Sequence, residues 1–216
     1  TDGDGSREPA IREARAMAGL RHRSICRVLE VVIDMPAGAR SDAWRPFIVM
    51  EWIEGRPLAE AWTSQPFERR IAMFMQVVEA VASMHAAGLV HRDIKPSNIL
   101  CDQEGVPVIV DFGLSAQAGS ANRLGGTPGW SAPEQFDAGA HVGPAADVFA
   151  LGVLFYNMLT GSLPFEGSSV ADVLRRAREG DAPLPEALRP GIAAPLQRIR
   201  SEEHTTGLQS HSDLVC

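Results

Sequence analysis

The segment most able to do chemistry is His91-Arg92-Asp93-Ile94-Lys95-Pro96-Ser97-Asn98, and the shorter motifs Asp111-Phe112-Gly113 and Ala132-Pro133-Glu134 follow it. Asp93 is a carboxylate that can accept a proton, and Lys95 supplies a positive charge beside it. Asn98 and Asp111 offer the oxygen ligands that a hard cation such as Mg²⁺ prefers. These residue types fit proton transfer from a hydroxyl group next to a bound magnesium ion.

Each of these residues also has an ordinary structural explanation. Asp93 could cap a turn, Asn98 could satisfy backbone groups, and Asp111 could begin a loop after a strand. The first motif alone specifies five positions, however, and about one in twenty per position makes a chance match roughly a one-in-a-million event per start point. The two ordered companion motifs lower that figure further, so the combination is not accidental.

These motifs resemble those of the eukaryotic-like protein kinase superfamily, and IKPSN with APEQ is most similar to its bacterial-type serine/threonine members. The similarity runs from about Pro9 to Arg198. It implies an α+β, two-lobed protein kinase fold, with a partial N-lobe of one helix and two strands and a mostly helical C-lobe. It also implies ATP and Mg²⁺ as cofactors and proteins with Ser or Thr hydroxyls as substrates.

The resemblance assigns catalytic roles, because phosphoryl transfer depends mainly on positioning and on charge stabilisation. Asp93 would orient the attacking hydroxyl and Lys95 would steady the transferred phosphate. Asn98 and Asp111 would hold Mg²⁺ against the nucleotide. Thr127 would contact Asp93 and Lys95 from the substrate-side loop, an arrangement typical of serine/threonine specificity.

The resemblance also marks residues on the nucleotide side. Glu13 lies on a segment similar to the kinase αC helix and would pair with the ATP-binding lysine, although a solvated helix charge is the alternative from the bare sequence. PFIVMEWIEG is similar to the strand that enters the hinge. Met50 is then the gatekeeper, the backbone of Glu51 to Ile53 would bond adenine, and Leu100 is a further nucleotide contact.

The remaining marked residues are regulatory or structural: His91, Arg92, Phe112, Gly113, Glu134 and Asp147. Arg92 indicates control by a phosphate in the following loop, where Ser115 and Ser120 are the hydroxyl candidates, and a plain solvated role remains open for both. Asp147 would anchor the catalytic-loop backbone from below. Its alternative role is a favourable negative charge at a helix N-terminus.

Periodicity predicts the elements that must position these residues. Apolar spacing predicts helices over Pro9–Leu20, Phe67–Ala87, Ala145–Leu159 and Val170–Glu179, and β-type runs predict antiparallel strands over Arg27–Ile33 and Pro46–Trp52. Shorter strands are expected at Leu89–Val90, Ile99–Leu100 and Val106–Val110. The second helix is expected to bury a stripe made of Ile71, Phe74, Met75, Val78, Val81, Ala82 and Met84, with its methionines, Met73 included, filling the core.

Composition limits the class of protein. The chain has 216 residues, 45% hydrophobic content and a formal net charge of −7, which fits one soluble domain without a general basic surface for nucleic acid or anionic membranes. Three separated cysteines indicate neither a disulfide framework nor a zinc site, and a cytoplasmic location is the default. Val148 to Leu159 is too short to cross a bilayer, which needs about 20 apolar residues, although a parent protein could be anchored elsewhere.

The expected organisation is a partial kinase domain over residues 1–199, with an N-lobe remnant at 1–50, a hinge at 51–55 and a C-lobe at 56–199. No Gly-rich loop or partner lysine precedes Glu13, so this polypeptide is expected to be inactive or nearly so. Residues 200–216 resemble the translation of a sequencing adapter and are expected to be a non-native tail. The alternatives are a pseudokinase-like binding module and a related small-molecule phosphotransferase.

Overall fold

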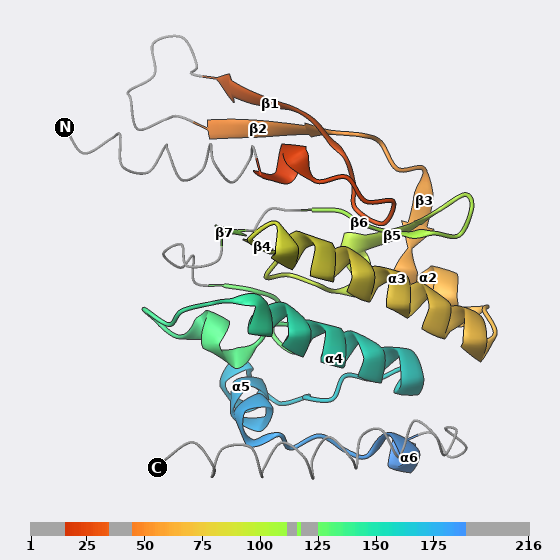
Figure 1. Ribbon diagram of the computed structural model, residues 1–216. Coiled ribbons are helices and arrows are strands. Elements are labelled where there is room, and N and C mark those ends of the chain that lie inside the picture. Colours follow the sequence, from red (N-terminus) through yellow and green to blue (C-terminus); the bar gives the residue numbers. More distant parts are fainter. Residues whose placement is uncertain (1–15, 35–44, 112–115, 118–124, 189–216) are drawn as a thin grey trace, which may run out of the picture.

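The computed structural model describes residues 16–34, 45–111, 116–117 and 125–188. In Figure 1, the strand pair β1–β2 lies at the top, and the long helices α3 and α4 run below it with α5 beneath them. The molecule is therefore a mixed α and β structure in which a small strand-containing part sits above a mostly helical body. This arrangement agrees with the expected partial two-lobed fold.

The upper part is an antiparallel pair made of β1 (Val28–Asp34) and β2 (Arg45–Met50). Val28 lies opposite Met50 and Val31 opposite Ile48, and these side chains pack toward the core. The antiparallel prediction is confirmed. The second strand was predicted two residues too long, because it ends at Met50 and Trp52 lies beyond it with 90% of its surface exposed.

Residues 16–19 are helical beneath this pair, and Met17 and Leu20 at the end of the segment are buried. The rest of the first predicted helix, including Glu13, lies outside the described residues. Backbone hydrogen bonds connect the upper part to the lower one. Cys26 N–H donates to the Ile109 carbonyl at 2.8 Å, and Ile109 N–H donates to the Ser24 carbonyl at 2.9 Å.

A three-stranded antiparallel sheet begins the lower part, with β3 (Gly55–Pro57) beside β5 (Ile99–Asp102) and β5 beside β6 (Pro107–Ile109). Sequence reasoning missed β3, which is only three residues long. Gly55 allows its close pairing, because a Cβ there would lie 2.2 Å from the carbonyl oxygen of Cys101. The glycine therefore fixes where the chain enters this sheet.

The helical body consists of α2 (Leu58–Thr63), α3 (Phe67–Ala86) and α4 (Pro144–Thr160). The fully buried residues of α3 are Met73, Val77, Ala80, Val81 and Met84. The predicted stripe was therefore wrong at Met75, which is 48% exposed, and at Ala82, which is also exposed. Periodicity alone predicted a face of α3 that is turned away from the one actually buried. The contacts of α3 with α4 and β6 decide which face is buried.

Helix α4 is apolar on nearly all sides and buries eight of its residues. It begins with Pro144 at a position where a missing N–H costs nothing, and it ends at Gly161 in the left-handed conformation. The Phe155 ring of α4 contacts the Phe74 ring of α3 with 4.9 Å between centroids. These two helices carry the residues that anchor the site described below.

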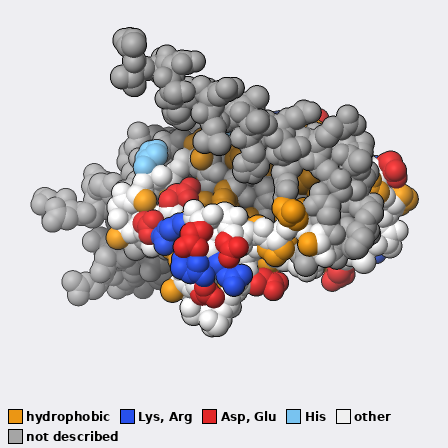
Figure 2. Space-filling model, turned by 90° about the horizontal axis from the view of Figure 1, so that it is seen from below, with side chains coloured by type: hydrophobic (Ala, Val, Ile, Leu, Met, Phe, Trp, Pro, Cys, Tyr) orange, Lys and Arg blue, Asp and Glu red, His pale blue; other side chains and the backbone are white. Residues whose placement is uncertain are grey.

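Shorter elements complete the fold. They are β4 (Leu89–Val90), paired with β7 (Ala116–Gln117), the 3-10 turns η2 (Pro96–Asn98) and η3 (Pro133–Phe136), and the helices α5 (Val170–Glu179) and α6 (Pro185–Leu188). Helix α5 matches its predicted bounds and buries none of its residues. Figure 2 views the molecule from the α5 side and shows basic and acidic side chains intermingled there, in keeping with ion pairs such as Arg178–Asp137 at 2.6 Å.

Two further observations bear on the sequence predictions. Cys26 and Cys101 are free and buried, and burial raises the pKa of each thiol to about 11. Within the described ranges, every helix is too short or too polar to cross a membrane.

Candidate active site

The central loop of the site, residues 91–95, leaves the buried strand β4 and is anchored by a carboxylate on α4. Asp147 is fully buried in the first turn of α4 and accepts the backbone N–H groups of His91 at 2.8 Å and Arg92 at 2.7 Å. The His85 ring, at the end of α3, contacts the same carboxylate at 2.8 Å. A buried carboxylate needs such partners, and here they hold the loop against both long helices.

His85 was missed by sequence reasoning. The sequence shows only a histidine in the last turn of a long helix, and that position does not predict a bond to a residue far away in the chain. The bond to Asp147 joins positions 62 residues apart.

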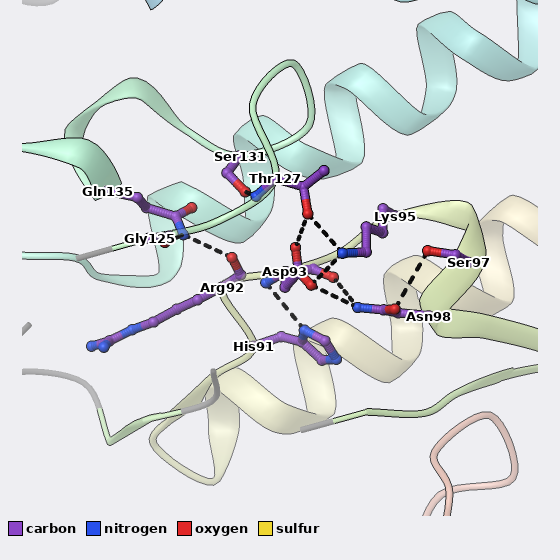
Figure 3. Close-up of polar contacts among 10 residues, drawn as sticks. All are labelled: His91, Arg92, Asp93, Lys95, Ser97, Asn98, Gly125, Thr127, Ser131 and Gln135. Carbon is purple, nitrogen blue, oxygen red and sulfur yellow. Dashed lines mark hydrogen bonds and ion pairs between the residues drawn. The ribbon is translucent and has the colours of Figure 1, made fainter. Parts of the chain in front are cut away.

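The chain adopts unusual backbone conformations on both sides of the site. Arg92 has φ of 70° and Asp111 has φ of 61°, and both are non-glycine residues in the left-handed region. Such conformations cost energy and persist where the surroundings hold them. Figure 3 shows the Arg92 side chain pointing away from Asp93, and its guanidinium donates to the Val142 carbonyl at 3.4 Å.

Asp93 lies at the centre of a closed polar network (Figure 3). Lys95 Nζ donates to Asp93 Oδ2 at 2.7 Å and to Thr127 Oγ1 at 2.6 Å. The Thr127 hydroxyl donates to Asp93 Oδ1 at 2.8 Å. Asn98 Nδ2 donates to Asp93 Oδ2 and to its backbone carbonyl, both at 2.9 Å. The structure thus brings together four of the residues singled out in the sequence.

This network determines the protonation state of Asp93. Burial by itself would raise the pKa of its carboxyl, but hydrogen bonds from Lys95 and Thr127, the positive charge of Lys95 and a hydrogen bond from Asn98 all lower it. The lowering contributions win, so the pKa of Asp93 is held below its ordinary value. Asp93 is therefore ionised at neutral pH and able to accept a hydrogen bond from an incoming hydroxyl.

The oxygen ligands predicted for magnesium lie at adjoining positions. Ile99 pairs with Ile109, and Val110 N–H donates to the Asn98 carbonyl at 2.9 Å, so Asp111 is the residue that follows the partner of Asn98. The buried Asn98 side chain uses its nitrogen to donate to Asp93, and its Oδ1, which the Ser97 hydroxyl contacts at 3.5 Å, is the atom that could ligate a metal. Asp111 is exposed. An amide oxygen and a carboxylate fit Mg²⁺, which keeps several of its ligands as water or phosphate.

Other metal sites are not evident in the described part of the chain, where no three His, Cys, Asp or Glu side chains cluster to hold an ion. His91, next to Asp93, is completely buried. Burial lowers the pKa of its ring, although Asp147, a hydrogen bond with the Val110 backbone, Asp93 and Asp111 act in the opposite direction. His91 is therefore a neutral structural residue whose Nδ1 accepts the Asp93 N–H at 3.3 Å.

The residues predicted for nucleotide binding lie where the upper part meets the lower one. Met50 and Ile53 are partly buried against the core, and Leu100 is half-buried on β5 opposite Pro57 and Val108. The Glu51 N–H donates to the Arg27 carbonyl at 2.9 Å. The Glu51 carbonyl accepts only a weak hydrogen bond at 3.5 Å from the Cys26 thiol among the bonds described, so it is the backbone group of Glu51 that could bond a ligand.

Several residues predicted for the site lie outside the part of the chain that the structure describes. Glu13, Phe112 and Gly113 lie outside the described residues, as do Ser115 and Ser120. Glu134 is half-buried in η3, where its neighbour Gln135 is buried and bonded to the catalytic loop. The sequence marks Gln135 only as the last residue of the APEQ motif and predicts no role for it.

A groove of about 960 Å³ opens beside the polar network. Lys95, Ser97 and Thr127 form its end near Asp93, and α2 and the end of α4 form its sides. Its lining includes apolar surface from Pro57, Trp62, Pro96, Trp130 and Met158. The groove is large enough for several amino-acid side chains, and two of its lining residues, Lys95 and Thr127, bond the ionised Asp93 carboxylate.

Comparison with known proteins agrees with this geometry. A family model described as protein kinase domain matches residues 1–190. Serine/threonine-protein kinase PknL of Mycobacterium tuberculosis is 36% identical over 188 residues, which cover 83% of this chain and 45% of that protein. CBL-interacting protein kinase 4 of Oryza sativa is 34% identical over 203 residues, which cover 88% of this chain and 42% of that protein.

A third relative is the DNA damage-responsive serine/threonine-protein kinase RqkA of Deinococcus radiodurans, which is 33% identical over 206 residues, covering 91% of this chain and 30% of that protein. The chain thus spans less than half the length of these relatives. The family model covers most of the chain, and the three relatives come from two bacteria and a plant. The chain belongs to the eukaryotic-like serine/threonine protein kinase family.

Proposed function

We propose that the protein carrying this domain transfers the γ-phosphate of ATP to a Ser or Thr hydroxyl of a protein substrate. The observation that carries this proposal is the closed network in which Asp93 accepts hydrogen bonds from Lys95, Thr127 and Asn98. It combines an ionised proton acceptor with a cation beside it, as phosphoryl transfer to a hydroxyl requires.

Within this proposal, each residue has a distinct role. Asp93 orients the substrate hydroxyl and accepts its hydrogen bond as the phosphate is transferred. Lys95 holds its positive charge 2.7 Å from Asp93 and would stabilise charge on the transferred phosphate. Thr127 fixes the Asp93 carboxylate from the side of the groove, at 2.8 Å.

Asn98 and Asp111 would hold magnesium, which supplies positive charge to the phosphate oxygens when bound. The backbone of Glu51 to Ile53, together with Met50 and Leu100, would hold the adenine ring at the junction between the two parts. Glu13 would belong to the same nucleotide site, through an ion pair with a lysine.

The groove beside Lys95 and Thr127 would bind the substrate segment around the phosphorylated residue. An extended peptide lying along α2 and the end of α4 would present its hydroxyl at the end formed by Lys95 and Thr127, the two residues that bond Asp93. The family resemblance implies protein substrates in general, and the groove is where we propose that they bind.

The test is a labelled-phosphate transfer assay on the gene product that carries this domain. Asp93→Asn keeps the size of the side chain but removes the carboxylate, and we expect kcat to fall about 10²- to 10⁴-fold. Asp181→Asn is the matched control, since Asp181 is an exposed carboxylate whose nearest cation, Arg176, is 3.9 Å away. Phosphate transfer that survives Asp93→Asn would contradict the proposal, as would phosphate found on Tyr rather than on Ser or Thr.

A further inference from the structure

Gln135 is a buried polar residue that bonds to two other segments of the site. Its side chain is 3% exposed. Nε2 donates to the Arg92 carbonyl at 2.7 Å and to the Gly125 carbonyl at 3.3 Å, and Oε1 accepts the Ala132 N–H at 3.3 Å. The Gly125 N–H in turn donates to the Gln135 carbonyl at 3.1 Å. Figure 3 shows Gln135 on the far side of Arg92 from Lys95.

The bond to Arg92 acts directly on the position of Asp93. The Arg92 carbonyl belongs to the peptide group that joins Arg92 to Asp93, so its orientation sets where the Asp93 backbone begins. Arg92 has φ of 70°, which a non-glycine residue keeps only where its surroundings hold it. Asp147 holds the N–H of Arg92 at 2.7 Å, and Gln135 holds its carbonyl at 2.7 Å. The strained residue is thus fixed from both ends.

The bond to Gly125 acts on Thr127. Residues 125–127 lie against Gln135 and Ser131 so closely that a Cβ on Gly126 would lie 2.3 Å from Ser131 Oγ and 3.2 Å from Gln135 Nε2. Ser131 Oγ accepts the Thr127 N–H at 2.8 Å, and Thr127 then bonds Asp93. The Gln135 side chain therefore bonds both the segment leading to Asp93 and the segment leading to Thr127.

We propose that Gln135 is a positioning residue for phosphoryl transfer, which sets Asp93 and Thr127 relative to each other by joining the Arg92 and Gly125 carbonyls. This inference rests on the proposed function. The chemistry requires an amide, because two carbonyl acceptors need a donor with two hydrogens and the Ala132 N–H needs an acceptor. A carboxylate would place negative charge against two carbonyl oxygens, and an apolar side chain would leave them buried without a donor.

The first experiment needs no activity and no variant. In the 216-residue chain, the side-chain amide protons of Gln135 should exchange with solvent at least about tenfold more slowly than those of Gln103, because buried bonded groups exchange only on opening. Gln103 is the matched reference, since it is exposed on the turn after β5. Equal exchange rates for the two side chains would overturn the inference.

The second experiment compares Gln135→Met, which keeps the volume, with Gln135→Glu, which keeps the shape. In the Met variant, the backbone amides of Asp93 and Thr127 should exchange faster while those inside α4 stay unchanged. Gln103→Met is the control and should change none of them. Unchanged exchange at both Asp93 and Thr127 in a folded variant would overturn the inference, even if the protein transfers phosphate.

The kinetic readout separates positioning from general damage to the fold. In the complete gene product, both variants should lower kcat by about 10²-fold at pH 8 with the KM for ATP nearly unchanged, because a small misplacement of reacting groups has an effect of that size. The kcat of Gln135→Glu, relative to wild type, should rise as the pH falls, because a protonated Glu regains one donor, whereas Gln135→Met should show no such recovery. A KM for ATP that rises in parallel with the loss of kcat would overturn the inference. If wild type transfers no phosphate but the exchange results hold, the proposed function fails, while the finding that Gln135 sets Asp93 and Thr127 relative to each other stands.

Discussion

Asp93 and His91 are two residues apart, and both have a pKa below the ordinary value, for opposite reasons. For Asp93, burial would raise the pKa, but donors from Lys95, Thr127 and Asn98 stabilise the ionised form. For His91, burial removes the stabilisation that water gives to the charged ring and outweighs the nearby carboxylates. The loop therefore holds a charged carboxylate and a neutral imidazole two positions apart.

The His91 shift has a consequence that depends on pH. Because its folded pKa lies below the unfolded value of about 6.5, the unfolded chain binds more protons at acidic pH. The stabilisation is fully present above about pH 6.5 and is lost as the pH falls toward the folded pKa. We expect the NMR signals of the His91 ring to remain those of a neutral imidazole at pH 6, where a histidine peptide in the same buffer is already mostly protonated. A His91 midpoint at or above that of the peptide would contradict this interpretation.

At the scale of elements, the sheet of β3, β5 and β6 determines how the chain passes from the upper part to the helices. Gly55 pairs with Asp102, and Pro57 pairs with Leu100. This pairing places Leu100 below the junction and starts α2 immediately afterwards at Leu58. The close approach of Gly55 to the Cys101 carbonyl is therefore a structural condition for the position of Leu100, a residue proposed to contact the nucleotide.

Gly55→Ala should destabilise the protein by about 1–3 kcal/mol, because its Cβ would meet a backbone carbonyl at 2.2 Å and the strand would have to shift. Gly152→Ala is the matched control. Gly152 lies in α4, a Cβ there would meet nothing within 4 Å, and alanine should stabilise the helix by about 0.5–1 kcal/mol. Urea unfolding of the two variants measures both changes. Equal effects on stability would show that the close approach at Gly55 is not limiting.

At the scale of the whole molecule, the groove unites segments that are distant in the sequence. It runs between α2 and the end of α4 and reaches the catalytic loop at Lys95 and the following segment at Thr127. The residues proposed for nucleotide binding, Met50, Glu51 and Ile53, are not among its lining residues. The groove is therefore separate from the residues proposed for nucleotide binding, and we assign it to the protein substrate alone.

A bulky side chain in the groove should therefore affect one reactant only. Ala59 is exposed on α2 and lines the groove, so Ala59→Trp should raise the KM for a protein substrate about tenfold, equivalent to about 1.4 kcal/mol, and leave the KM for ATP unchanged. Ala72→Trp is the control, because Ala72 is exposed on α3 away from the groove. Steady-state kinetics with each reactant varied in turn make the comparison. Parallel changes in both KM values would contradict the assignment of the groove.

Much of the site followed from the order of residues alone. The motif containing Asp93, Lys95 and Asn98 is so specific that predicting its chemistry did not depend on knowing the fold, and the structure brings these side chains together with Thr127. Long periodic segments also gave accurate elements, as with α3, α4 and α5, because a helix of several turns repeats its pattern often enough to be recognised. Short elements such as β3 and α6 carry too few residues for such a pattern.

What the sequence determined by itself was the protein kinase family and the motif residues for which we propose the chemistry, because each motif is local and its residue types are typical of that reaction. The tertiary structure decided which face of α3 is buried, and it revealed His85 and Gln135 as partners of the catalytic loop. His85 bonds Asp147 across 62 positions, and Gln135 bonds Arg92 across 43. Such contacts exist only after distant segments have packed together, and nothing in the neighbouring residues specifies them.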